Sequence, residues 1–363
     1  MPFKPVIAPV KPPLRPLRVL HLTGDAEDAG GILSVLRNLQ AEFNAQGWSQ
    51  SVWVRPEYEE RRQPPLDYLR SDCVHGFATN YARLLASALP AFRDLRRQLR
   101  VAQFDVIHGH TQGTLLVALL MAHRTRLPVF FTNHSYANLR FLYRWIALHS
   151  RLRVVLLTPN MARHFGLLSE QGPRVSIVSE CAAPEFFDFS PVPKTPSRRP
   201  VRLVGVGAIM RWKRWDLVAQ ALSLLAPAER QQVRFDLWGG TSKLGDSEFF
   251  GDELNRQIAA AGIADQFRMC GTTNRVKDQV SGADWFLLPS TNEPCSVALI
   301  EALALGVPAI VSRSGGNVDI INERLNGLFF EPGNPESLAA VLRKIIARQA
   351  TMAAPPTIRE SVR

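Results

Sequence analysis

The sequence predicts an α/β protein with two domains, each built around a parallel β-sheet. Short apolar segments alternate with amphipathic helical segments through most of the 363 residues, which is the pattern of consecutive strand–helix–strand units. A proline-rich segment at residues 189–200 separates two such series and is typical of a semi-rigid linker. We therefore predict a Rossmann-like domain at residues 1–188, a second at residues 201–348, and a tail or crossing segment at residues 349–363.

The composition fits a globular protein with enough apolar residues for two cores. Hydrophobic residues make up 46% of the chain and charged residues 21%. The longest apolar stretch, at about residues 114–122, is too short to span a bilayer, and the N-terminal segment lacks a signal-peptide core. The four cysteines form no Cys-x-x-Cys pair, which argues for a reducing compartment and against a zinc site. We expect a cytoplasmic protein that is at most peripheral on the cytoplasmic face of a membrane.

Positive charge is concentrated in the first half. Residues 1–200 hold 25 Lys and Arg against 15 Asp and Glu, whereas the remainder holds 18 against 17. This excess indicates either a solvated basic face or an anionic partner, such as anionic lipid or a phosphorylated acceptor. No nucleic-acid-binding signature is present, so we expect no nucleic-acid partner. Two segments, Tyr81–Leu99 and residues 136–153, combine bases with apolar side chains and predict either packed helices or contact with a membrane surface.

In the first half, ligand-binding residue types follow several predicted strands. Gly30 and Gly31 lie at the first strand-to-helix turn, where they either only make the turn or let a ligand approach the backbone. His110 and His134 each end a strand, and α/β sheets place ligands at strand carboxyl ends. We expect both histidines to face one cleft. The predicted strands are Arg18–Leu22, Ser51–Val54, Val106–His110, Val129–His134, Val154–Thr158 and Val175–Val178, with an irregular surface excursion at residues 55–75.

The second half begins with a strand that leads directly into a group of bases. Arg211, Lys213 and Arg214 follow the strand Val201–Val206, where they either would suit a diphosphate or form an exposed basic turn. Later strands are predicted at Val233–Trp238, Phe267–Gly271, Trp285–Leu288, Ala309–Ser312 and Leu328–Phe330, with helices at Val276–Ala283 and Ser337–Arg348.

The most informative stretch is residues 284–318. After the strand at Trp285–Leu288, Pro294 is predicted to open a helix that ends near Gly306. Glu293 would lie at the entrance of this helix and Glu301 about two turns deeper. Backbone N–H groups at the helix start would offer an anion site, and we expect Cys295, Ser296 and Val297 to supply them. Two acids beside an anion site suggest a bound nucleotide diphosphate, although either glutamate alone is typical of a solvated helix.

At these residues the chain resembles the family-4 retaining glycosyltransferases, which carry Glu-x7-Glu, then Gly-Val-Pro and a Gly-Gly turn. Here the matching positions are Glu293, Glu301, 306–308 and 315–316. The resemblance extends over about residues 200–345 and, more loosely, over the first half. It implies the GT-B fold, in which two Rossmann-like domains face a central cleft.

The resemblance also implies roles for individual residues. Asp105–His110 matches a family segment, and His134 matches a histidine that lies beside the donor sugar. Lys213 matches a phosphate-binding lysine, whereas the family's arginine position is Ala208, so Arg211 would have to substitute. The segment after residue 178 departs from the family's usual turn. The implied catalytic residues are His134, Glu293 and Lys213, and the implied donor-binding residues are Gly30, Gly31, Arg211, Lys213, Cys270, Gly271, Cys295, Ser296, Val297 and Glu301.

Together these features predict a retaining, hexosyl-type glycosyltransferase that uses a nucleotide-diphosphate sugar. We expect a sugar or lipid-linked acceptor, with a product in polysaccharide, lipopolysaccharide or glycolipid assembly. No Asp-x-Asp motif is available to bridge a metal and a diphosphate, so no metal or other cofactor is expected. Two alternatives are a nucleotide-sugar epimerase of the same architecture and a non-catalytic nucleotide-binding module.

Overall fold

The computed structural model describes residues 15–28, 30–76, 81–188, 200–241 and 247–363, and it divides the chain into two compact units. The first unit is Met1–Ser179 and the second is Glu180–Arg363. We predicted that the first domain would extend to residue 188. Residues 180–188 instead pack with the second unit, because α7 (Pro184–Phe187) contacts α12 (Val297–Ala304) and the Arg363 guanidinium lies 5.7 Å from the Phe187 ring. Most of the predicted linker lies outside the described residues.

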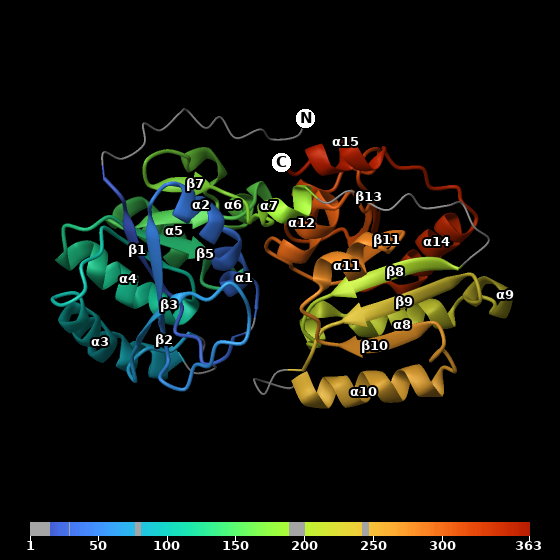
Figure 1. Cartoon of the computed structure of the whole chain (residues 1–363), viewed down its shortest axis with the longest axis horizontal. Coiled ribbons are helices and arrows are strands. Elements are labelled where there is room, and N and C mark those ends of the chain that lie inside the picture. Colours follow the sequence, from blue (N-terminus) through green and yellow to red (C-terminus); the bar gives the residue numbers. More distant parts are fainter. Residues whose placement is uncertain (1–14, 29, 77–80, 189–199, 242–246) are drawn as a thin grey trace. The chain divides into compact units, whose positions relative to one another are not determined.

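The first unit, blue to green in Figure 1, contains a seven-stranded parallel sheet. Its strand order is β3-β2-β1-β4-β5-β6-β7. Its strands are β1 (Arg18–Leu22), β2 (Ser49–Val54), β3 (Asp67–Arg70), β4 (Val106–Gly109), β5 (Val129–Asn133), β6 (Arg153–Leu156) and β7 (Val175–Ile177). Its helices are α1 (Gly31–Asn38), α2 (Gln40–Ala45), α3 (Tyr81–Gln98), α4 (Gln112–Arg124), α5 (Arg140–His149) and α6 (Pro159–His164), with a 3₁₀ turn η1 (Leu168–Glu170). Apolar strand residues such as Leu20, Val52 and Ile107 are fully buried, because parallel sheets are covered on both faces.

The second unit contains a six-stranded parallel sheet with the order β10-β9-β8-β11-β12-β13. Its strands are β8 (Val201–Val206), β9 (Val233–Trp238), β10 (Phe267–Gly271), β11 (Trp285–Leu288), β12 (Ala309–Ser312) and β13 (Gly327–Phe330). Besides α7 and α12, its helices are α8 (Trp215–Ser223), α9 (Pro227–Arg230), α10 (Ser247–Ala260), α11 (Val276–Ser281), α13 (Asn317–Ile320), α14 (Pro335–Ile346) and α15 (Pro355–Glu360), with a 3₁₀ turn η2 (Arg211–Lys213). Its core is centred on Trp215, Phe235 and Leu287.

Both sheets reverse their strand order at one point. The reversal lies between β1 and β4 in the first unit and between β8 and β11 in the second. At such a switch point the connections leave in opposite directions, and ligands of open α/β sheets bind in the crevice at the strands' carboxyl ends. Residues that follow these four strands are therefore the first candidates for a functional site.

Two segments differ from the sequence prediction. The excursion at residues 55–75 contains the edge strand β3, which pairs with β2 in parallel. The segment at residues 349–363 contains α15, which packs on the second unit: Ile358 is buried, and the Asn326 amide donates to the Ser361 hydroxyl at 3.0 Å. Among the described residues, no helix is both long and apolar enough to cross a bilayer.

Candidate functional site

A buried ion pair joins the two loops at the switch point of the second unit. Nζ of Lys213, at the end of η2, lies 2.8 Å from Oε2 of Glu293. The Ser290 hydroxyl donates to the same oxygen at 2.8 Å. The Lys213 and Glu293 side chains are only 12% and 7% exposed, so both charges are largely removed from water. Both residues were catalytic candidates from the sequence, and the structure brings them into contact.

The helix after Glu293 begins later than predicted. Its first residue is Val297 rather than Pro294, because Ser296 is the N-cap and its hydroxyl accepts a hydrogen bond from the Leu299 N–H at 3.3 Å. Glu293 therefore lies in the loop before the helix. The first backbone bond of the helix is made by the Ile300 amide, and the Leu299 amide is capped by Ser296, so the amides of Val297 and Ala298 are left at the helix start.

Cys295 belongs to the same loop and is buried. Burial raises the pKa of its thiol, so the side chain stays protonated at neutral pH. We predicted an anion site made by the amides of Cys295, Ser296 and Val297. The later helix start places Cys295 and Ser296 before the helix and leaves only Val297 of these three in it, and the anion site stays a prediction.

A glycine turn fixes the position of Glu293. The Gly316 N–H donates to the Glu293 carbonyl at 2.8 Å, and Ser312 donates its hydroxyl to the Ser290 carbonyl. Gly315 has φ +57°, and a Cβ there would lie 2.9 Å from the Glu293 amide nitrogen and collide with its carbonyl oxygen. The Gly-Gly turn is thus needed for the close approach of two protein backbones.

Replacing Gly315 with alanine should displace Glu293 and lower the activity of this site at least tenfold, because the added methyl group occupies the space of the Glu293 backbone. The left-handed backbone conformation adds about 1 kcal/mol of strain. Gly262→Ala is the matched control, since Gly262 has φ +62° with open space around its Cβ position. Thermal unfolding measures the effect on stability, and the rate of the catalysed reaction measures the effect on activity. Equal behaviour of the two variants would contradict the packing role.

The other donor-binding candidates of this unit have contacts of their own. Arg211 pairs with Glu253 of α10 at 2.8 Å and lies over the Phe250 ring at 5.3 Å, so α10 holds its guanidinium. Cys270 and Gly271 end β10, the edge strand, where Gly271 has φ +74°.

Glu301 lies on α12 and is half-buried. Burial raises the pKa of the Cys181 thiol to about 11, and the Glu301 charge contributes to the shift. Glu301 therefore lies near the segment that begins the second unit.

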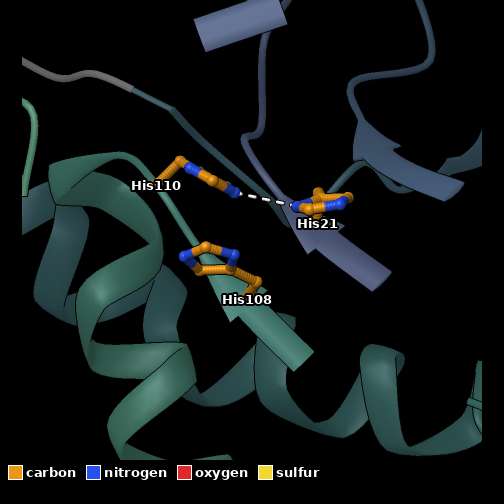
Figure 2. A group of neighbouring side chains, drawn as sticks. All are labelled: His21, His108 and His110. Atoms are coloured by element: carbon orange, nitrogen blue, oxygen red, sulfur yellow. Dashed lines mark hydrogen bonds between the residues drawn. The ribbon is translucent and has the colours of Figure 1, made fainter. Parts of the chain in front are cut away.

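In the first unit, histidines gather at the switch point. His21 on β1 is the register partner of His108 on β4, and His110 lies two residues further along the same face. Nδ1 of His21 lies 2.9 Å from Nε2 of His110, as Figure 2 shows, and Nδ1 of His110 lies 3.1 Å from Nε2 of His134. His110 and His134, both predicted from strand ends, are therefore brought together.

His21, His108 and His110 are neutral. Burial lowers the pKa of His21 to about 3 and the pKa values of His108 and His110 well below the usual range, and repulsion between the rings adds to the effect on the latter two. Asp25, in the loop after β1, has the opposite shift: burial raises the pKa of its carboxyl to about 6, and attraction to His134 opposes the rise. The site thus joins uncharged imidazoles to a carboxyl that titrates near neutrality.

Three of the imidazoles are close enough together to be considered as ligands of one metal ion. One nitrogen from each of His21, His108 and His110 lies within 4.8 Å of the others. A tetrahedral zinc ion with Zn–N distances of about 2.05 Å holds its nitrogens about 3.3 Å apart and needs a lone pair from each. The 2.9 Å contact between His21 and His110 is instead a hydrogen bond with a proton in it. At this separation a hydrogen bond fits the His21–His110 contact better than ligation of one metal ion by both rings.

Gly30 and Gly31 mark the start of α1, as predicted. Gly30 is the N-cap with φ +85°, and a Cβ there would meet open space. Its carbonyl accepts hydrogen bonds from Ser34 at 3.2 Å and Arg62 at 3.3 Å. The positive φ explains why the first residue of the pair is glycine.

Sequence reasoning missed His21, Asp25 and Ser290. His21 lies inside a strand rather than at its end, so only the pairing of β1 with β4 shows that it meets the other histidines. Asp25 and Ser290 each follow a switch-point strand closely, and this position could have identified them once the strand order was known.

Two family models match the chain and together span most of it. A model described as glycosyl transferases group 1 matches residues 190–355, and a glycosyl transferase 4-like domain matches residues 30–179. The 2-deoxystreptamine N-acetyl-D-glucosaminyltransferase of Niallia circulans is 25% identical over 280 residues, covering 68% of each chain. The D-inositol 3-phosphate glycosyltransferase of Geodermatophilus obscurus is 26% identical over 304 residues, covering 75% of this chain and 66% of its own.

Solved structures share the fold. A sucrose-phosphate synthase from Thermosynechococcus elongatus superposes with a TM-score of 0.77 at 19% identity, covering 95% of this chain and 94% of its own. Anabaena HepE in complex with UDP-glucose superposes with a TM-score of 0.72 at 15% identity, covering 95% of this chain and 94% of its own. The two parallel-sheet units and these matches define a glycosyltransferase of the GT-B class. The chain belongs to the group 1, GT4-like glycosyltransferases.

Proposed function

We propose that the protein is a retaining, nucleotide-diphosphate-sugar-dependent glycosyltransferase whose second unit binds the donor at its switch point. The observation that carries this proposal is the buried Lys213–Glu293 pair. An ammonium has three N–H donors, and Glu293 takes one, so the others can go to phosphate oxygens. These bonds strengthen as the leaving diphosphate gains charge, which stabilises the transition state.

Glu293 would contact the donor sugar. Lys213 and Ser290 both bond to its Oε2 atom, and no hydrogen bond to Oε1 comes from the described part of the chain. Oε1 can therefore accept from a sugar hydroxyl while the other oxygen keeps Lys213 in place. We assign Glu301 to the ribose hydroxyls, Cys270 and Gly271 to the base, and His134 to the sugar, as the family resemblance implies.

The deciding experiment supplies nucleotide sugars with candidate acceptors and follows both products. We expect release of free nucleoside diphosphate together with a glycoside of the donor's anomeric configuration. An epimerase would change the sugar without needing an acceptor, and a non-catalytic module would bind nucleotide without turnover. Either result would contradict the proposal, as would inversion at the anomeric carbon.

We predict that EDTA leaves initial transfer rates within about twofold. Lys213 and the α12 amides would neutralise the diphosphate, as a bridging metal ion does in other enzymes. Rates measured after chelation, with Mg²⁺ and Mn²⁺ added back, check this. Activity that is lost to EDTA and restored by one of these ions would contradict the metal-free site.

An exposed apolar face supports a membrane-borne acceptor. On α5, Phe141 is 84% and Trp145 56% exposed, and Leu142 lies on the same side of the helix. Arg140 is the first residue of α5, Arg151 follows the helix by two residues, and both are exposed. Aromatic side chains flanked by bases are typical of helices that lie in the interface of an anionic membrane.

We predict that the protein binds anionic vesicles and that binding falls as salt rises, since exposed charges are screened beyond about 8 Å at physiological ionic strength. Replacing Phe141 and Trp145 by serine should reduce binding at least tenfold. Phe249→Ser is the matched control, because Phe249 is 60% exposed but lies in the other unit. Vesicle co-sedimentation measures all three. Wild-type binding by the double variant would contradict the role of α5, and no binding at low salt would favour a soluble acceptor.

A further inference from the structure

The histidines of the first unit form a chain that leads from the sheet interior to His134. Topology creates this chain. His21 and His108 are register partners on adjacent strands, and His110, Thr132 and His134 continue on the same face toward the strands' carboxyl ends. His110 is the central member, because its two ring nitrogens contact His21 at 2.9 Å and His134 at 3.1 Å. His108 is not part of this chain, and its Nε2 atom forms a hydrogen bond with the Thr132 hydroxyl at 2.7 Å.

Because His110 is neutral, the hydrogen bonds of the chain must all run in the same direction. Burial keeps both His21 and His110 uncharged, so each has one N–H and one lone pair. His110 therefore donates to one neighbour and accepts from the other. Only two arrangements remain: His21 donates to His110 and His110 to His134, or every bond is reversed.

The free end of the chain distinguishes these arrangements. Nε2 of His21 is buried and has no hydrogen-bond partner among the residues that the structure describes. If His21 donates through Nδ1, its Nε2 atom carries only a lone pair that no donor uses. In the reversed chain it would be a buried N–H without an acceptor, which folded proteins rarely tolerate.

The other end of the chain lies near a carboxyl group. The Asp25 carboxyl interacts electrostatically with His134. When His110 donates to Nε2 of His134, the proton of a neutral His134 ring must be on Nδ1, the nitrogen not used by His110. A nearby carboxylate stabilises an imidazole N–H that can point toward it.

We propose that His21, His110 and His134 form a one-directional hydrogen-bond chain, in which His21 and His110 are positioning residues that hold His134 as its Nδ1–H tautomer. All three rings then carry their proton on Nδ1, the form that free histidine disfavours in water. His134 keeps Nε2 turned to His110 and offers Nδ1–H to its surroundings. The consequence for catalysis rests on the proposed function, since there His134 would donate to an oxygen of the sugar.

The test is ¹⁵N NMR of the full chain labelled at histidine, with signals assigned through single His→Asn variants. The chemical shifts and two-bond couplings of the ring separate the two neutral tautomers from the charged form. We expect Nδ1–H for His21, His110 and His134 at neutral pH, and mainly Nε2–H for the exposed His123. Nε2–H or charged rings in the chain would overturn the proposal.

Variants at the start of the chain add a matched comparison. The amide nitrogen of asparagine lies near the position of histidine Nδ1, so His21→Asn should keep the donor to His110, whereas His21→Leu removes it. We expect His134 to keep its tautomer in His21→Asn and His108→Gln but to become mixed in His21→Leu. In the transfer assay, His21→Leu should lower kcat at least tenfold with KM for the donor within about threefold, and His21→Asn should restore most of the rate.

Two further outcomes are decisive. An unchanged His134 tautomer in a folded His21→Leu would contradict the chain, whatever the activity. Zn²⁺ binding at one equivalent that removes the Nδ1–H signals would also contradict it, because a metal needs the lone pairs that the chain protonates. If the tautomers are as expected but no glycosyl transfer is found, the proposed function fails while the chain stands.

Discussion

Replacing Lys213 with alanine is expected to slow sugar transfer by about 10²–10³-fold, which is the usual loss when one preorganised donor to a developing negative charge is removed. Lys213 is 12% exposed, so its charge acts in a site that largely excludes water. The interaction should be strongest in the transition state, because charge builds up on the leaving diphosphate as the glycosidic bond breaks.

The same substitution leaves Glu293 buried and unpaired. Breaking a buried ion pair from one side destabilises a protein by about 3–5 kcal/mol. Slow sugar transfer by Lys213→Ala could therefore reflect unfolding rather than the loss of a catalytic group. The double variant Lys213→Ala/Glu293→Gln removes both charges and should recover most of the lost stability without recovering transfer.

A third variant controls for the loss of a cation in the same unit. Arg343 pairs with Glu229 at 3.3 Å and is 45% exposed, so Arg343→Ala should change stability by no more than about 1 kcal/mol and leave transfer unaffected. Denaturant unfolding and initial-rate kinetics give both quantities. Full transfer by a folded Lys213→Ala protein would remove Lys213 from the mechanism.

The second large effect separates the two glutamates. Glu301→Gln should weaken binding of the free nucleoside diphosphate by about 1–3 kcal/mol, the range for a hydrogen bond to a charged group. Glu293→Gln should leave that affinity unchanged or tighter, because Lys213 loses the carboxylate that competes with phosphate. With the full sugar donor, however, Glu293→Gln should lower the transfer rate.

Calorimetry with the nucleoside diphosphate, beside transfer kinetics, measures both effects. Glu336→Gln is the matched control, since Glu336 is an exposed residue in the first turn of α14, another helix of the second unit. It should change neither quantity. If Glu293→Gln lost nucleotide binding while Glu301→Gln kept it, the donor would lie in the opposite orientation.

Local patterns in the sequence were sufficient to locate most of the elements. The strands β1, β8, β9, β10, β11 and β12 have the predicted bounds, because burial on both faces makes each a short apolar run between polar or flexible residues. The sequence also predicted where α12 ends. Gly306 has φ +77°, and the Val307 and Gly306 amides donate back to Ala302 and Leu303, a helix end that glycine favours.

The start of α12 shows where local reasoning fails. Pro294 is a good first helical residue, but Ser296 caps the helix while the Gly315–Gly316 turn holds the Glu293 backbone in a loop. That turn is more than twenty residues away along the chain. Edge strand β3 was missed for a related reason: its residues are only partly buried, so they form no apolar run.

The sequence by itself determined the two α/β units, their strands and most of the residue types at the strand ends, since these depend on short-range patterns of burial and backbone preference. Only the tertiary structure decided which of those residues meet. Lys213 and Glu293 are 80 residues apart, and His21 and His110 are 89 apart. Each pair touches because the strand order places β8 beside β11 and β1 beside β4, and no local pattern encodes that order.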